Sequence, residues 1–384
     1  MQQTSPPPFD PRAAVIVCLD LGDAAYEDGV EEIVRLVESA GVARHRVVRG
    51  KRQRPEPKLF CGRGKVEEVA AAAVELNAGV VVFNHELSPA QERNLERELQ
   101  RPVMDRTEVI LEIFAQRAQT SEGKLQVELA QLEHLSTRLV RGWTHLERQR
   151  GGLGKTGGPG EKQIELDRRY IGKRVRVLRG KLEQLRQRRE VQRRARARGD
   201  VLSVSLVGYT NAGKSTLFNA LAKARAYSAD QLFATLDTTT RRIWLPQAGS
   251  VVLSDTVGFI RDLPHSLVAA FRATLEETVR ADLLLHVVDA ASPARAEQAE
   301  EVNKVLAEIG ADGVPQLLVW NKIDLAGLEP GVDRDEYGNI RRIRVSARMG
   351  DGLGDLRVAI TEIAVARASA RGESAPEAIF LQPH

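Results

Sequence analysis

The stretch GYTNAGKS, residues 208–215, matches the phosphate-binding pattern G-x-x-x-x-G-K-[ST] at every fixed position. The run VLSVSLV before it is typical of a buried strand, and TLFNALAKA after it has the composition of a helix. A glycine-rich turn between strand and helix lets successive backbone N–H groups point at phosphate oxygens. We therefore predict a nucleoside triphosphate site formed by Gly208, Tyr209, Thr210, Asn211, Ala212, Gly213, Lys214 and Ser215. In such a loop the lysine reaches the β- and γ-phosphates, and the serine hydroxyl ligates Mg²⁺.

The stretch VVLSDTVGF predicts the part of the site that senses the γ-phosphate. Its strand delivers Asp255 to the shell around Mg²⁺, and Gly258 offers a backbone N–H to the γ-phosphate. We expect the nucleotide and its metal to contact Asp255, Thr256, Val257 and Gly258.

Two later stretches predict that the base is guanine. PQLLVWNKID is a buried strand ending in an NKxD motif, whose carboxylate can accept hydrogen bonds from guanine N1 and N2. Adenine lacks this pair of donors, so a mismatched base would leave buried polar groups unpaired. In RIRVSARMG, a backbone amide after the strand can reach guanine O6. The predicted contacts for GTP and GDP are Asn321, Lys322, Ile323, Asp324, Ser346, Ala347 and Arg348.

The segment LFATLDTTTRRI occupies the expected position of the first switch, where a threonine closes over Mg²⁺ when triphosphate is bound. Thr235 and Thr239 are both candidates, and the residues alone do not separate them; we prefer Thr235. The expected metal ligands are thus Ser215 and Thr235. The switch residues predicted to contact the nucleotide are Phe233, Ala234, Thr235, Leu236 and Asp237.

The catalytic set expected from these motifs is Lys214, Asn211, Thr235 and Gly258. Phe259 stands where related enzymes carry a glutamine that orients water, and it can neither donate nor accept a hydrogen bond. We therefore expect a low intrinsic rate of hydrolysis. Asn211 is either a ligand for K⁺ beside the phosphates or an asparagine that braces the loop. Both interpretations stay open at this point.

The order of predicted elements indicates an α/β fold with a P-loop GTPase domain, an N-terminal α/β domain and an antiparallel helical hairpin. We expect a disordered lead-in over 1–11, the α/β domain over 12–108 with a largely parallel sheet, and the hairpin over 109–198. The nucleotide domain follows over 199–370, with a tail over 371–384. Six glycines and one proline between residues 150 and 162 predict a non-helical loop at the tip of the hairpin.

Charge is concentrated in this hairpin. The chain carries a net +4, but residues 138–198 hold 20 Lys or Arg against 6 Asp or Glu. Such a basic segment favours a polyanionic partner, with structured RNA as the first candidate; the alternative is a solvated helix surface.

Cys18 and Cys61 lack metal-ligand spacing. With no signal peptide and no apolar run long enough for a membrane span, we expect a cytoplasmic protein, and we expect a monomer.

With these residues in hand, the chain resembles the HflX family of the Obg–HflX group of GTPases. The resemblance covers nearly the whole chain, and its most specific parts are LQVELAQLEHLSTRLVRGWTHLERQ, GGLGKTGGPGEKQIELDRR, FATLD and DTVGFI. FATL also resembles the FTTL segment of Obg, which supports Thr235 as the metal ligand. Thr238 departs from the family, which usually has proline there.

The resemblance implies a GTPase that binds the large ribosomal subunit and its RNA, and that separates stalled or idle ribosomes into subunits. It also implies that the tip of the hairpin lies near the peptidyl-transferase region. Two alternatives come from the residues themselves. One is an RNA-binding scaffold whose nucleotide site is mainly structural, suggested by Phe259. The other is a tRNA-modification GTPase, suggested by Asn211.

Overall fold

The fold is taken from a computed structural model, which describes residues 9–23, 25–141, 159–196, 201–223, 232–264, 267 and 272–370. The chain forms two compact units. Residues 1–116 and 124–182 belong to the first, and residues 117–123 and 183–384 belong to the second. Each of the two long helices of the predicted hairpin contains residues of both units.

Four parallel strands in the order β2-β1-β3-β4 form the sheet of the first unit. The central strand β1 has seven consecutive buried residues, because a parallel sheet with helices on both faces exposes neither side to water. The expected α/β domain is confirmed. Its elements are β1 (Asp10–Asp20), α1 (Tyr26–Ser39), β2 (Arg44–Lys51), α2 (Arg63–Glu75), β3 (Ala78–Phe83), α3 (Pro89–Leu99) and β4 (Val103–Asp105).

In this unit the predicted helix cap is present, and one strand begins earlier than predicted. Ser88 caps α3: its Oγ accepts a hydrogen bond from the Gln91 backbone N–H at 3.3 Å, and Gln91 Oε1 accepts one from the Ser88 N–H at 3.0 Å. Strand β1 begins at Asp10, inside the predicted lead-in. A strand can start there because the Asp10 N–H pairs with the carbonyl of Asn77.

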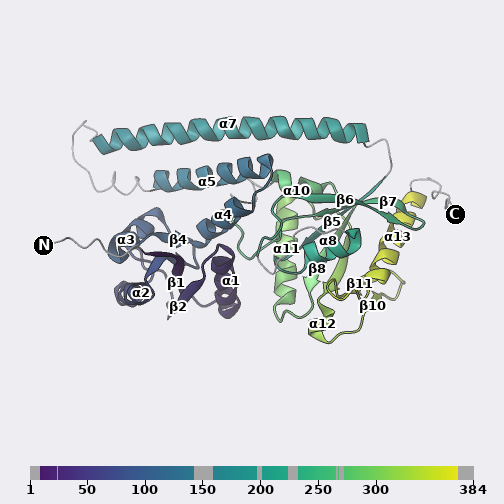
Figure 1. Cartoon of the computed structure of the whole chain (residues 1–384), viewed down its shortest axis with the longest axis horizontal. Helices are drawn as coiled ribbons and strands as arrows, with labels where there is room; N and C mark the ends of the chain where they lie inside the picture. The colour runs from purple at the N-terminus through teal and green to yellow at the C-terminus, as the bar shows by residue number, and fades with distance from the viewer. Residues whose placement is uncertain are drawn as a thin grey trace. The chain divides into compact units, whose positions relative to one another are not determined.

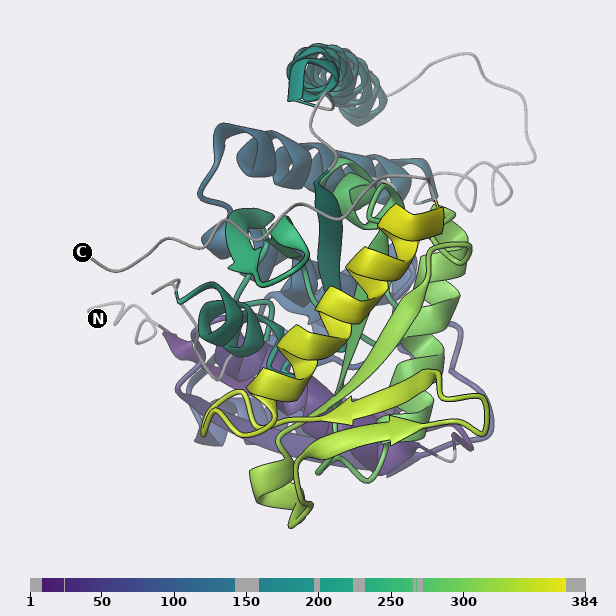
Figure 2. The same ribbon diagram turned by 90° about the vertical axis from the view of Figure 1, so that its right-hand side faces the viewer.

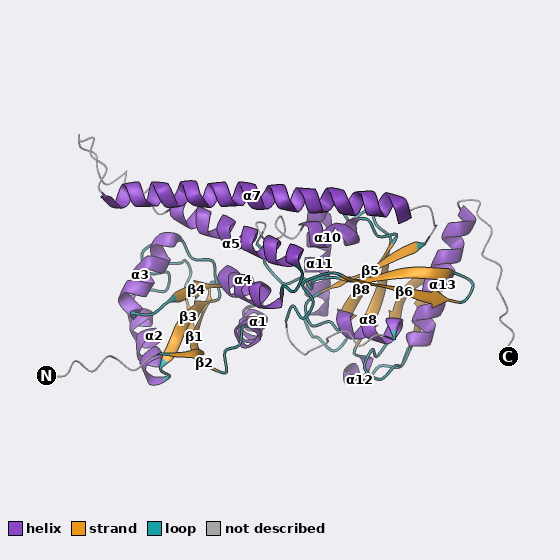
Figure 3. Cartoon of the chain, turned by 45° about the horizontal axis from the view of Figure 1, so that its top comes forward, coloured by secondary structure: helices purple, strands orange, loops and turns teal. Residues whose placement is uncertain are grey.

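The helical part comprises α4 (Arg106–Arg117), α5 (Ser121–Arg141) and α7 (Pro159–Arg196). Within the first unit, α5 and α7 lie side by side (Figures 1 and 3). Two ion pairs join them, Arg174 with Glu128 at 2.6 Å and Arg179 with Glu133 at 2.7 Å. On α7, the side chain of Leu178 is fully buried.

The predicted loop at residues 150–162 extends too far at its C-terminal end. Residues 150–158 lie outside the described residues, whereas Pro159 to Lys162 form the first turn of α7. Proline suits the first position of a helix, because its missing N–H would have no partner in the helix and its φ angle is already helical. The proline that the glycine-rich pattern assigns to the loop therefore starts the second long helix.

The second unit contains a seven-stranded sheet in the order β10-β11-β9-β8-β5-β7-β6. Its strands pair in parallel, except for β6 with β7 and β10 with β11. The strands are β5 (Leu202–Gly208), β6 (Thr239–Leu245), β7 (Gly249–Asp255), β8 (Leu283–Asp289), β9 (Gln316–Asn321), β10 (Gly331–Arg334) and β11 (Ile340–Arg344). The helices are α8 (Lys214–Ala222), α10 (Arg272–Val279), α11 (Arg295–Ile309), α12 (Ile323–Ala326) and α13 (Leu353–Ala370).

Helices cover both faces of this sheet, and the site lies at one edge. Val204 and Leu206 face a core shared with α8 and α13, and α10 and α11 pack on β5 and β8; Figure 2 shows α13 crossing in front of the strands. Because β5, β7, β8 and β9 are parallel, their carboxyl ends meet at the same edge, where ligands bind in open α/β sheets. Among the described residues, no helix is long and apolar enough to cross a bilayer.

Candidate nucleotide-binding site

The phosphate-binding loop has the backbone that its glycines permit. Gly213 has a φ of +90°, and a Cβ there would collide with the amide nitrogen of Asn321. Lys214 is 6% exposed, and its Nζ donates to the carbonyls of Gly208 at 3.1 Å and Tyr209 at 2.8 Å. Burial lowers the pKa of Lys214 to about 8. The ammonium group is thus held inside the loop, where a triphosphate would restore its full charge.

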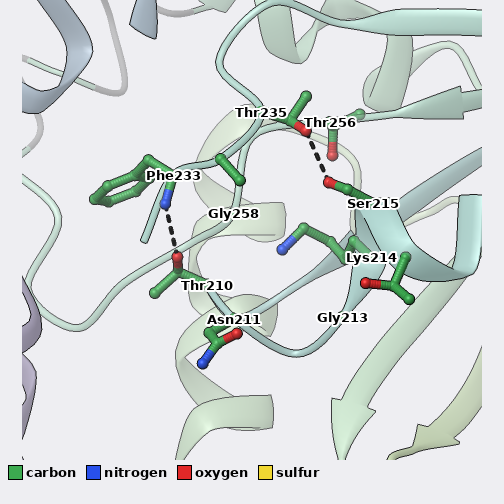
Figure 4. Close-up of a pocket in the computed structure, with 11 residues that line it drawn as sticks. Thr210, Asn211, Gly213, Lys214, Ser215, Phe233, Thr235, Thr256 and Gly258 are labelled. Carbon is green, nitrogen blue, oxygen red and sulfur yellow. Dashed lines mark hydrogen bonds between the residues drawn. The ribbon is translucent and has the colours of Figure 1, made fainter. Parts of the chain in front are cut away.

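The hydroxyls of Ser215 and Thr235 lie close together near this lysine (Figure 4), and the Asp255 carboxylate binds both. Ser215 Oγ lies 2.7 Å from Thr235 Oγ1 and donates to Asp255 Oδ2 at 2.7 Å, and Thr235 Oγ1 donates to the same oxygen at 2.8 Å. Burial raises the pKa of Asp255, and among the described residues its second oxygen is buried without a hydrogen-bond partner. Two hydroxyls and a carboxylate are hard oxygen ligands of the kind that Mg²⁺ prefers.

The segment after β7 packs closely against the phosphate-binding loop. A Cβ at Gly258 would lie 2.8 Å from the Thr210 Cα and 2.9 Å from the Lys214 Nζ. Phe259 pairs with the loop through its backbone: its N–H donates to the Gly208 carbonyl at 3.1 Å, and its carbonyl accepts from the Thr210 N–H at 2.6 Å. The Phe259 side chain is 1% exposed, so it fills the interior and leaves the pocket to the Gly258 backbone.

The first switch is fastened to the same loop. Thr210 Oγ1 accepts a hydrogen bond from the Phe233 N–H at 3.1 Å (Figure 4), and Phe233 itself has a positive φ of 53°. Phe233, Ala234 and Thr235 line the pocket. Leu236 is buried, whereas the Asp237 carboxylate binds the backbone of residues 119 and 120.

The guanine-recognition motif is tied to the phosphate loop through Asn321. Its amide nitrogen donates to the Ala212 carbonyl at 2.9 Å, and its amide oxygen accepts from the Ala347 N–H at 2.9 Å. Ser346 Oγ donates to Asp324 Oδ1 at 2.7 Å, which orients the carboxylate expected to bind the base. Asn321 therefore joins three of the predicted motifs in one bonded unit.

Ten of the 24 predicted nucleotide contacts line one pocket, and those of the predicted guanine motif do not line it. Its lining contains Thr210, Asn211, Gly213, Lys214, Ser215, Thr216, Phe233, Ala234, Thr235, Thr256 and Gly258. The sequence pattern does not predict Thr216, because the motif covers only the eight positions before it. It also does not predict Asp289, whose carboxylate pairs with Lys322 of the guanine motif at 2.8 Å. A carboxylate at the end of the strand next to β9 is the signal that could have found Asp289.

Comparisons with known proteins identify the chain as similar to GTPases. Family models match residues 27–115 as "GTP-binding GTPase N-terminal", 117–196 as "GTP-binding GTPase Middle Region" and 203–322 as "50S ribosome-binding GTPase". A crystal structure of SsGBP in complex with GDP superposes with a TM-score of 0.51 at 25% identity, over 93% of this chain and 99% of that one. The fold is thus that of a known GDP-binding protein.

Two curated relatives carry the same name. The GTPase HflX of Escherichia coli (strain K12) is 58% identical over 341 residues, which cover 88% of this chain and 80% of the relative. The GTPase HflX of Magnetococcus marinus is 50% identical, over 86% of this chain and 77% of the relative. By these matches, the chain belongs to the HflX family of GTPases.

Proposed function

We propose that this GTPase binds the large ribosomal subunit and couples GTP binding and hydrolysis to the separation of ribosomes into subunits. The family model that matches residues 203–322 is described as a ribosome-binding GTPase, which supports the first part. The switch geometry supports the second part, because the Thr235 hydroxyl donates to Asp255 Oδ2 at 2.8 Å, an arrangement expected of a first switch closed over its metal site.

The observation that carries the ribosome proposal is the charge on α7. Arg168, Lys173, Lys181 and Arg188 are exposed on this helix, and none forms an ion pair with another residue in the described part of the chain. Unpaired cations on a long helix bind a phosphate backbone by releasing its counterions. Structured RNA, read by shape and phosphate contacts, is the polyanion that this surface fits best.

The proposed cofactor is Mg²⁺, held by Ser215 and Thr235 with Asp255 behind them. Asn211 is proposed to accept K⁺ beside the phosphates, since it lines the pocket with a left-handed φ of 59°. The ion would supply positive charge that other GTPases take from an arginine. Because the buried Phe259 side chain cannot orient water, the intrinsic rate is low, and the ribosome supplies what is missing.

Sedimentation with purified large subunits tests this proposal. The protein should co-sediment with a GTP analogue and much less with GDP. The variant Lys173→Gln/Lys181→Gln should bind more weakly. The slope of log affinity against log salt concentration should become shallower by about two. The matched control, Arg241→Gln/Arg341→Gln, removes two exposed cations from the sheet of the second unit and should bind as the parent does. Equal binding with GTP and GDP, or equal loss in both variants, would count against the proposal.

A further inference from the structure

The Asp237 carboxylate, at the end of the first switch, is held by the segment that leads into α5. Asp237 Oδ2 accepts hydrogen bonds from the backbone N–H groups of Gln119 at 2.8 Å and Thr120 at 3.0 Å. Asp237 Oδ1 accepts a third from the Thr120 hydroxyl. These residues all belong to the second unit, although they are 117 and 118 positions apart in the sequence.

Thr120 and Gly123 shape the place where this carboxylate sits. Thr120 Oγ1 accepts a hydrogen bond from the Gly123 N–H at 2.9 Å, so that one hydroxyl caps the start of α5 and also binds Asp237. A Cβ at Gly123 would fall on Asp237 Oδ1. The missing side chain of Gly123 therefore leaves the space that the carboxylate fills, and a negative charge at a helix N-terminus is favourable.

Only Leu236 separates this anchor from the metal site. Leu236 is 2% exposed, which fixes the backbone between Asp237 and Thr235. Two residues span at most about 7 Å of extended chain, so the position of the Asp237 backbone restricts where the Thr235 hydroxyl can lie. That hydroxyl is the one that meets Ser215 Oγ and Asp255 Oδ2.

We propose that Asp237 and Thr120 are positioning residues for GTP hydrolysis. They hold Thr235 in the closed arrangement of the first switch, so the GTPase centre is complete only with the segment 117–123. This segment belongs to the same unit but lies outside the predicted nucleotide domain of residues 199–370. The proposal rests on the GTPase activity and is independent of ribosome binding. Because α5 continues from this segment into the first unit, the nucleotide state is linked to a helix that leaves the second unit.

Three single substitutions in the 384-residue chain test this, without ribosomes. Thr120→Val removes the hydroxyl and keeps the shape of the side chain. Gly123→Ala removes no polar group and favours the helix, but its methyl displaces the carboxylate. Both should lower kcat for GTP about tenfold, as expected for the loss of a hydrogen bond to a charged group, and should raise the Mg²⁺ concentration for half-maximal hydrolysis. Their affinity for GDP should stay within about twofold of the parent's. The corresponding change in binding free energy is smaller than the contribution of one hydrogen bond.

The third substitution and a control complete the test. Thr120→Ser keeps the hydroxyl, so this variant should retain the parental rate and Mg²⁺ dependence that Thr120→Val loses. Gly172→Ala is the matched control, because Gly172 also lies in a long helix and its Cβ would meet nothing within 4 Å. Parental kcat and Mg²⁺ dependence in Thr120→Val and Gly123→Ala would overturn the proposal. An equal fall in the affinities for GTP and GDP, together with a lower unfolding temperature, would also overturn it by showing a merely structural role.

Discussion

Thr235 Oγ1 donates a hydrogen bond of 2.8 Å to Asp255 Oδ2, which joins the first switch to the end of β7. The two residues come from the segments predicted to respond to the γ-phosphate, as the two switches of GTPases do. Ser215 contacts both, so the three side chains form one oxygen-lined cluster, where we propose that Mg²⁺ binds.

This geometry favours Thr235 over Thr239 as the proposed metal ligand. Thr239 is the first residue of β6 and pairs in register with Asp255 through the sheet, so its backbone is engaged in the ladder. Thr235→Val should lower GTP hydrolysis about 10- to 100-fold, which is typical when a metal site loses part of its support. It should leave GDP affinity nearly unchanged. Thr239→Val is the control, and steady-state kinetics at several Mg²⁺ concentrations compare the two. A larger loss in Thr239→Val would reverse the assignment.

Substitution of Asn321 should affect both nucleotides alike. Its side chain makes two buried hydrogen bonds that connect the phosphate loop with the motif at Ala347, and each is worth about 1 kcal/mol. Asn321→Ala should therefore weaken the affinities for GTP and GDP by a similar factor, roughly 30-fold. Calorimetric titration of both nucleotides measures this. A loss confined to GTP would mean that Asn321 senses the γ-phosphate and does not brace the loops.

The pKa of Lys214 predicts a pH dependence of GTP binding. Without nucleotide this pKa is about 8 because the side chain is buried, and a bound triphosphate raises it again. Below pH 8 the lysine is already charged, so affinity is full. Above pH 8 binding must take up a proton, and affinity should fall by up to about tenfold per pH unit. The arginine in Lys214→Arg keeps its charge over this range, so any GTP binding by this variant should not fall with pH. An equal fall of affinity with pH in that variant would assign the effect to another group.

His286 predicts acid sensitivity of folding. Burial lowers its pKa to about 4 from the ordinary 6.5, so the folded chain favours the neutral ring. The corresponding stability is fully present above pH 6.5 and is lost as the pH falls toward 4, by at most about 3 kcal/mol. Denaturant unfolding of the parent and of His286→Gln between pH 7 and pH 4 isolates this contribution, because the other groups titrate in both proteins. Parallel curves for the two proteins would exclude a role for His286.

Much of the fold and the site could be predicted because the motifs are local. The strand, turn and helix around Gly213 follow from neighbouring residues, and the parallel sheet then brings Asp255 and Asn321 to the same edge. The start of α7 is misplaced by the sequence pattern because proline and glycine next to each other are typical of a loop, yet Pro159 opens the helix. The bond between Thr120 and Asp237 could not be predicted, since no local pattern pairs residues 117 positions apart.

Phe259 is a second case in which the sequence alone predicts only part of the structure. The sequence identifies a residue that cannot orient water, but only the packing shows that its ring is buried while its backbone pairs with Gly208. Residue type limits the chemistry, and tertiary contacts decide where the side chain goes.

The rate of GTP hydrolysis with and without purified large ribosomal subunits, in K⁺ and in Na⁺, tests the proposed function most directly. We predict a slow rate for the protein alone and a marked increase with large subunits, greater in K⁺ than in Na⁺, and lost in Lys214→Ala. A rate that the subunits leave unchanged in both salts would contradict a ribosome-stimulated GTPase.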